Sequence, residues 1–306
     1  MQKMKTILIT GSNGLTGQKI IYALRGRKDV QCIATSKGAN RTKAKDGYTY
    51  ESLDITSQEE ITAIFEKYKP NVLINTAAMT NVDACEVQKE ECLKMNVSAV
   101  EYLINSCKKH NTHFIHLSTD FVFDGNKGSA YSETDNPNPE SFYSQSKYDG
   151  ELLLQKSDLK WAILRTIIIY GVVDDNQRSN LVLWTKNSLE KKQSIKVITD
   201  QYRAPTLAED LADACVQAAM KGATSIYHVS GEETKSILEW VNITADFFQL
   251  DKSVIIPVTT ASLNQPAKRP PVTGFIIDKA KRDLDFHPHT FMEGLQIVQE
   301  QLANLK

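Results

Sequence analysis

The chain has 306 residues, of which 41% are hydrophobic and 24% charged, and its net charge is −1. This composition is typical of a soluble globular protein, and the balanced charge argues against nucleic acid or a membrane surface as a partner. No apolar run approaches the ~18 residues that a transmembrane helix needs. Five cysteines without a C-x-x-C pair, and histidines without metal-ligand spacing, predict a reduced, cytoplasmic protein with no metal site.

The first predicted element is a buried strand over residues 6–10, which is short, apolar and β-branched. This apolar run is too short for the core of a signal peptide. Gly11-x-x-Gly14-x-x-Gly17 follows at once and opens a helical pattern over residues 18–24. Such glycines allow a tight turn and close approach of the backbone to a pyrophosphate, and a helix N-terminus offers free N–H groups to phosphates. The turn therefore predicts a dinucleotide-binding site.

A second strand is predicted over residues 30–35. NAD-binding folds often place an acid at the end of this strand, where it binds the adenosine ribose. Here Ser36 and Lys37 follow, with Arg41 nearby and no acid. A hydroxyl and a cation suit a 2′-phosphate, so NADPH is the predicted cofactor and NADH the alternative. These cations could equally be solvated loop residues.

Strands and helices then alternate, which predicts a parallel, doubly wound sheet of the Rossmann type. Further strands are predicted at 48–53, 71–75, 113–118, 161–169, 195–199 and 226–229, and helices at 57–67, 86–110, 181–192, 205–220, 236–250 and from 291. We assign residues 1–170 with 206–230 to a dinucleotide-binding domain, and 171–205 with 231–306 to a smaller C-terminal α/β lobe that binds the substrate. Ligands bind at the carboxyl ends of such strands, where Thr119 and Asp120 fall.

Tyr143 and Lys147 open a helical stretch at an i, i+4 spacing, which places both side chains on one helix face. A free Tyr titrates near ~10 and a free Lys near ~10.4. An ammonium close to a phenol favours the phenolate and lowers its pKa. The pair could then exchange a proton near neutral pH, although a surface helix with an ordinary Tyr and Lys has the same pattern.

Several motifs in this order resemble the extended short-chain dehydrogenase/reductases, and more specific ones resemble the dTDP-4-dehydrorhamnose reductases over residues 5–300. The general motifs are the glycine turn, Leu53-Asp54, Asn75-Thr76-Ala77-Ala78 and Tyr143-x-x-x-Lys147. The specific ones are the stretches 79–86, 117–125 and 204–212, of which Ser118-Thr119-Asp120-Phe121-Val122-Phe123-Asp124-Gly125 is the most specific.

The resemblance implies roles for individual residues. Thr119 would bind the keto oxygen of the sugar, Tyr143 would protonate it as hydride arrives from the nicotinamide, and Lys147 would hold the nicotinamide ribose and lower the pKa of Tyr143. Besides Ser36, Lys37, Tyr143 and Lys147, the residues assigned to the cofactor are Gly11, Asn13, Gly14, Leu15, Thr16, Gly17, Asp54, Ile55, Ala77, Ala78, Met79, Thr80 and Leu117. Those assigned to the substrate are Val82, Thr119, Asp120, Phe121, Ile168 and Arg269.

The sequence departs from this family at three positions. Phe121 stands where Tyr is usual, Ile168 where Trp packs on the sugar, and Ser144 where Gly follows the catalytic Tyr. Ile offers a sugar ring less contact and more room than Trp, so we hypothesise that Ile168 relaxes discrimination among 4-keto sugars. Alternatively, Trp184 or Tyr202 fills the same space.

Three functions are compatible with these observations. The first is an NADPH-dependent reductase of the 4-keto group of a nucleotide-linked 6-deoxysugar, with dTDP-4-dehydrorhamnose as the first candidate substrate. The second is a related reductase or epimerase acting on another nucleotide sugar. The third is a cofactor-binding regulatory subunit resembling the β subunit of methionine adenosyltransferase. In each case a monomer or a homodimer is expected.

Overall fold

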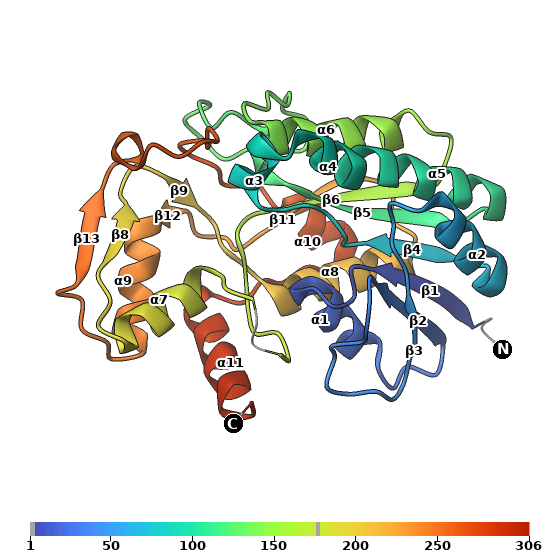
Figure 1. Cartoon of the computed structure of the whole chain (residues 1–306), viewed down its shortest axis with the longest axis horizontal. Helices are drawn as coiled ribbons and strands as arrows, with labels where there is room; N and C mark the ends of the chain where they lie inside the picture. The colour runs from blue at the N-terminus through green and yellow to red at the C-terminus, as the bar shows by residue number, and fades with distance from the viewer. Residues whose placement is uncertain (1–3, 176–177, 306) are drawn as a thin grey trace.

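A seven-stranded parallel sheet forms the centre of the computed structural model, which describes residues 4–175 and 178–305 (Figure 1). The strand order is β11-β6-β5-β4-β1-β2-β3. The strands are β1 (Lys5–Thr10), β2 (Val30–Ser36), β3 (Thr49–Ser52), β4 (Val72–Asn75), β5 (His113–Thr119), β6 (Trp161–Thr166) and β11 (Ser225–Val229). β4 and β5 are buried along their whole length, as expected of parallel strands that are covered on both faces.

Helices cover both faces of this sheet, so the predicted doubly wound fold is confirmed (Figure 1). One face carries α1 (Leu15–Leu24), α8 (Ala208–Lys221) and α10 (Asp278–Leu284), and the other carries α2 (Gln58–Tyr68), α5 (Ala99–His110) and α6 (Phe142–Gln155). β1 lies between β2 and β4 and is parallel to both, so the order in which successive strands are added to the sheet reverses there. In open α/β sheets, this reversal is where ligands bind.

The single helix predicted over residues 86–110 is wrong, because the structure divides this segment. It contains α3 (Val82–Val87), α4 (Lys89–Leu93), a π-helical turn η1 (Lys94–Ser98) and then α5. Asn96 in the π-turn explains the interruption: its buried side chain accepts from Met79 N at 2.9 Å and donates to Met79 O at 3.0 Å. A Cβ at Gly150 of α6 would lie 2.7 Å from Asn96 O, so glycine lets α6 pack directly on this turn.

The strand predicted over residues 161–169 is also too long. β6 ends at Thr166, and Ile168 adopts a φ of 29°, which is strained for a β-branched residue. The chain then leaves the main sheet as β7 (Ile169–Tyr170), paired with β10 (Thr206–Leu207). Thr206 N donates to both Ile167 O and Ile168 O, at 3.1 and 3.0 Å, so the bend is fixed by backbone hydrogen bonds. The predicted helix at 205–220 consequently begins later, at Ala208.

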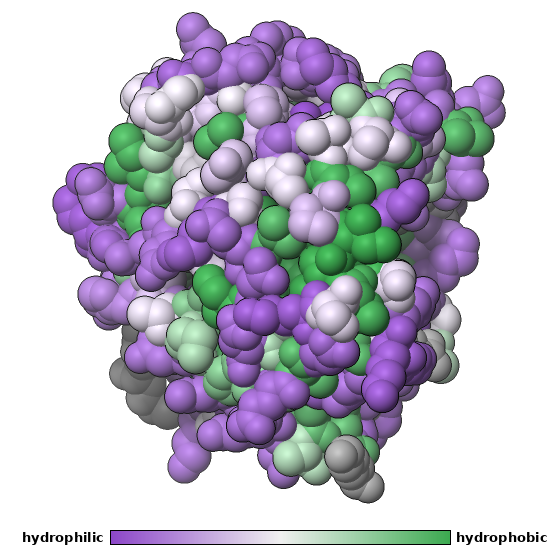
Figure 2. All heavy atoms as spheres, turned by 90° about the vertical axis from the view of Figure 1, so that its left-hand side faces the viewer, coloured by the Kyte–Doolittle hydropathy of each residue, from purple (hydrophilic) through white to green (hydrophobic). Residues whose placement is uncertain are grey.

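The remaining elements gather at one end of the molecule, which we call the small lobe (residues 181–203 and 235–258; left in Figure 1). They are α7 (Leu181–Glu190), β8 (Ile195–Ile198), β9 (Tyr202–Arg203), β12 (Lys235–Ser236), α9 (Ile237–Phe247) and β13 (Ile255–Val258). Figure 2 shows this end as a mostly hydrophilic surface crossed by a hydrophobic strip. The final helix, α11 (Phe291–Ala303), packs beside α9. The exact domain boundaries proposed from the sequence stay a prediction.

Among the described residues, every helix is too short or too polar to traverse a lipid bilayer.

Candidate active site

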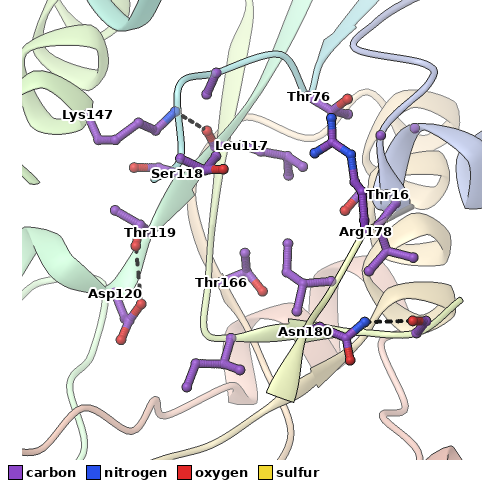
Figure 3. A pocket seen from close by; sticks show the side chains of 18 of the residues that line it. Thr16, Thr76, Leu117, Ser118, Thr119, Asp120, Lys147, Thr166, Arg178 and Asn180 are labelled. Atoms are coloured by element: carbon purple, nitrogen blue, oxygen red, sulfur yellow. Dashed lines mark hydrogen bonds between the residues drawn. The ribbon is translucent and has the colours of Figure 1, made fainter. Parts of the chain in front are cut away.

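Two adjoining hollows lie at the carboxyl ends of β1, β4, β5 and β6. The main cavity, of about 390 Å³, contains the end of β5 and the start of α6 (Figure 3). The second, which we call the adjoining groove, has a volume of about 630 Å³ and runs past the ends of β2 and β3. The residues that line both are Gly14, Thr76, Ala78, Thr80 and Arg178. The two hollows are therefore continuous, as a site for an elongated ligand requires.

The glycine turn lies at this junction and fits a diphosphate. A Cβ at Gly11 would lie 2.7 Å from Thr76 Oγ1, and one at Gly17 only 2.4 Å from Gly11 O, so both positions need glycine. Gly14 caps α1 without a side-chain hydrogen bond, and the first turn of α1 carries no acid. The first backbone N–H groups of α1 are thus left for an anion.

The adjoining groove is lined by many of the residues that the sequence assigned to the cofactor. They are Gly11, Ser36, Lys37, Asp54, Ile55, Ala77, Ala78, Met79 and Thr80. Lys37 Nζ lies 2.7 Å from Asp54 Oδ2, although the lysine side chain is 80% exposed. Burial raises the pKa of Asp54, but hydrogen bonds from Lys37 and Thr56 outweigh it and lower that pKa to about 2.

Asn13 and Arg269 are the two assigned residues that line neither hollow. Asn13 holds the loop after β2, donating to Ala39 O and accepting from Arg41 N, both at 2.9 Å. Arg269 donates to Asp83 Oδ2 at 2.7 Å. Their assigned ligand contacts stay a prediction.

The main cavity brings together Thr119 from β5 with Tyr143 and Lys147 from α6. Val82, Asp120, Phe121 and Ile168 line the same cavity.

Ser144, which departs from the family pattern, completes a capping box: Ser141 Oγ accepts from Ser144 N, and Ser144 Oγ accepts from Ser141 N. Capping fixes the first turn of the helix, and that turn carries Tyr143.

The expectation that Lys147 lowers the pKa of Tyr143 is wrong for this geometry. Burial raises the pKa of the phenol well above its ordinary value, with the Thr119 hydroxyl opposing this effect and Asp120 adding to it. Lys147 points elsewhere: its Nζ donates to Leu117 O at 2.8 Å and lies 3.3 Å from His116 Nε2. Tyr143 therefore keeps its proton at neutral pH, which is the state that a proton donor needs.

Behind Lys147 lies a buried polar chain that sequence reasoning missed. Thr10 Oγ1 donates to Asn75 Oδ1 at 2.6 Å, and Asn75 Nδ2 lies 3.1 Å from His116 Nδ1. Burial lowers the pKa of His116 well below its ordinary value, and Lys147 adds to this effect. A neutral imidazole therefore packs against Lys147.

Asp120 connects the end of β5 to the small lobe. Its carboxylate accepts from Thr119 Oγ1 at 3.1 Å and from Thr273 Oγ1 at 2.5 Å, and it lies 3.6 Å from Arg203 Nε of β9. Burial raises the pKa of Asp120, while the Arg203 guanidinium opposes this shift. The carboxylate thus holds Thr119 in place as well as facing the cavity.

The lining of the cavity near Ile168 excludes the alternative that Trp184 or Tyr202 fills the space left by the smaller Ile side chain. Trp184 packs against the core of the small lobe, Tyr202 is 40% exposed, and neither belongs to the described lining of the main cavity. Instead Arg178, Ser179 and Asn180, from the loop before α7, complete this side of the cavity. Of these, Asn180 had a sequence signal, because Asn is a preferred N-cap directly before a helical pattern.

Burial lowers the pKa of Lys147 to about 8, which gives a prediction for pH dependence. Lys147 is charged below that pH and neutral above it, so the ammonium that would hold the ribose hydroxyls is lost as the pH rises. We expect kcat/KM, which reports the free enzyme, to decline above about pH 8. A profile that stays flat well into the alkaline range, in protein shown by circular dichroism to remain folded, contradicts this assignment.

Comparison with known proteins gives one family for nearly the whole chain. The family model described as the RmlD substrate binding domain matches residues 4–304. A dTDP-4-dehydrorhamnose reductase from Aggregatibacter actinomycetemcomitans is 31% identical, covering 97% of this chain and 99% of the relative. The methionine adenosyltransferase 2 subunit beta of Danio rerio is 27% identical, covering 87% of this chain and 81% of the relative.

Solved structures agree with the fold. The crystal structure of a dTDP-4-dehydrorhamnose reductase from Clostridium acetobutylicum superposes with a TM-score of 0.86 at 29% identity, covering 97% of this chain and 99% of that chain.

Proposed function

Because the chain belongs to the family of the RmlD substrate binding domain, we propose that it reduces the 4-keto group of a nucleotide-linked 6-deoxysugar with NADPH. dTDP-4-dehydrorhamnose is the first candidate substrate, and dTDP-rhamnose the corresponding product. The observation that carries this proposal is the convergence of Thr119, Tyr143 and Lys147 in one cavity that is continuous with the glycine turn.

The residues divide the chemistry between them. Bound NADPH supplies a hydride, and the protein orients the reactants and supplies a proton. Thr119 lies at the end of β5 and positions the keto oxygen, while the protonated Tyr143 donates to it. Lys147 lines the same cavity and holds the sugar hydroxyls of the cofactor. Phe121, edge-on to Tyr143 with ring centroids 6.0 Å apart, helps to exclude water from the phenol.

The test is turnover of purified protein with NADPH and a panel of 4-keto nucleotide sugars. Oxidation of NADPH with one of them, giving the reduced sugar, supports the proposal, whereas a redox-neutral change at the sugar carbon points to an epimerase. A second candidate is a cofactor-binding regulatory subunit, which the similarity to methionine adenosyltransferase 2 subunit beta favours. That function predicts tight NADPH binding without turnover of any sugar in the panel.

The substrate preference is expected to depend on Ile168, which lines the cavity with a strained backbone. Trp at this position adds a rigid face for a sugar ring. We expect Ile168→Trp to change the ratio of kcat/KM values between dTDP-4-dehydrorhamnose and its analogues, with Ile256→Trp on the exposed β13 as the control. If neither this ratio nor any KM changes, the position does not set substrate choice.

Cofactor preference is expected to depend on Lys37. A 2′-phosphate in the adjoining groove would draw this exposed lysine away from Asp54. We expect Lys37→Ala to weaken NADPH binding by about 5-fold, since exposed ion pairs contribute at most ~1 kcal/mol, and to leave NADH affinity unchanged. Lys67→Ala, which removes an exposed lysine paired with Glu51, is the control. Equal affinities of the wild type for NADPH and NADH would refute the preference.

A further inference from the structure

Arg178 lies where the two hollows meet. It lines both the main cavity and the adjoining groove. Figure 3 shows the Arg178 side chain on the same side of the cavity as Thr76 and as Thr16 at the start of α1, and all three line the main cavity. Since the N-terminus of α1 is the part of the site suited to phosphates, Arg178 is placed beside the predicted diphosphate position.

The loop that carries Arg178 is held at both ends. Asn180 caps α7 by accepting from Leu183 N at 3.2 Å, and its Nδ2 donates to Gly171 O at 2.7 Å. At Gly171, a Cβ would lie 3.3 Å from Leu15 Cδ1, so the start of the loop packs on the first residue of α1. Gly171 and Asn180, which flank Arg178 in the sequence, are therefore hydrogen-bonded to each other, and Gly171 packs on the first residue of α1.

Among the cations that line the two hollows, Arg178 is the best placed to neutralise a bound diphosphate. The glycine turn itself contains no cation, and a helix N-terminus supplies only about half a positive charge, whereas a dinucleotide diphosphate carries two negative charges. Of the other lining cations, Lys37 pairs with Asp54, and Lys147 is buried against Leu117 O. Lys94 is exposed and lines the adjoining groove but not the main cavity, whereas Arg178 lines both. Within residues 4–175 and 178–305, no ion pair or hydrogen bond is assigned to the Arg178 guanidinium.

We propose that Arg178 binds the diphosphate of the dinucleotide together with the N–H groups at the start of α1. A guanidinium fork matches two phosphate oxygens at once, which a lysine ammonium does not. Arg178 thereby links cofactor binding to the loop that leads into the small lobe. This inference rests on the proposed function only in requiring that the protein binds a dinucleotide.

The experiment compares ligand binding to wild type and Arg178→Ala by isothermal titration calorimetry, with no turnover involved. Loss of a charged hydrogen bond of ~1.5 kcal/mol corresponds to about 10-fold, so we expect NADPH and NADH each to bind about 10-fold more weakly. Adenosine 2′-monophosphate, which lacks the diphosphate, should bind both proteins equally. Arg178→Lys should fall between them. Arg282→Ala, which removes an exposed arginine on α10, is the matched control.

The outcomes separate this inference from the proposed function. If the wild type binds NADPH and Arg178→Ala binds it equally well, the inference is overturned and the reductase proposal stands. Weakened adenosine 2′-monophosphate binding would also overturn it, by placing Arg178 on the 2′-phosphate. Unchanged unfolding temperatures for Arg178→Ala exclude a folding defect. A wild type that binds neither dinucleotide overturns both proposals.

Discussion

Replacing Tyr143 with Phe is expected to lower turnover by about 100-fold or more, the usual contribution of a general acid, and to leave NADPH affinity unchanged. The phenol is buried beside Thr119, and its raised pKa keeps it protonated at neutral pH. Phe retains the ring and its edge-on contact with Phe121 but cannot supply a proton. Steady-state kinetics and NADPH titration of both proteins measure the effect.

Tyr148→Phe is the matched control for this prediction, because Tyr148 lies on the same helix but packs on the core of the sheet. We expect its turnover to stay near that of wild type. If Tyr143→Phe instead retains near-wild-type turnover, Tyr143 is not the proton donor.

The largest expected effect on stability comes from Glu151, which attaches α6 to the sheet. Arg165 of β6 donates to Glu151 through Nη2 at 2.6 Å and Nε at 3.0 Å, and both side chains are buried. Removing one member of a buried pair leaves an uncompensated charge, which costs about 3–5 kcal/mol. We expect this loss in the free energy of unfolding of Glu151→Ala, measured in urea.

Two further variants make the test specific. Glu151→Leu combined with Arg165→Met removes both charges, and this should recover most of the lost stability. Asp158→Ala breaks an exposed pair with Lys108 and should change stability little. If Glu151→Ala is as stable as Asp158→Ala, the pair does not hold α6 in place.

Local sequence patterns correctly predicted the parts of the site that are formed by residues close together in the sequence. The strand, glycine turn and helix of residues 5–24 form one continuous unit, so apolar periodicity and three glycines were sufficient. Tyr143 and Lys147 face the same cavity because their spacing places them on one face of α6.

The sequence-based predictions that were wrong concern features that depend on contacts between distant segments of the chain. Asn96 interrupts a helical pattern because it hydrogen-bonds to Met79 in another loop, and periodicity contains no such information. The expected effect of Lys147 on Tyr143 assumed that the two side chains meet, but the lysine is drawn to Leu117 O on β5. Arg178 lines the same two hollows as Gly14 of the glycine turn, and it comes from a loop that no motif marks.

The central claim is that this protein transfers hydride from NADPH to a keto carbon of a nucleotide sugar. The most direct test supplies NADPH deuterated at the nicotinamide hydride position, together with dTDP-4-dehydrorhamnose, and analyses the sugar product by mass spectrometry and NMR. We predict one deuterium at the former keto carbon with wild type, and about 100-fold less labelled product with Tyr143→Phe at equal early times. An unlabelled, unreduced sugar in the presence of bound NADPH would contradict the claim.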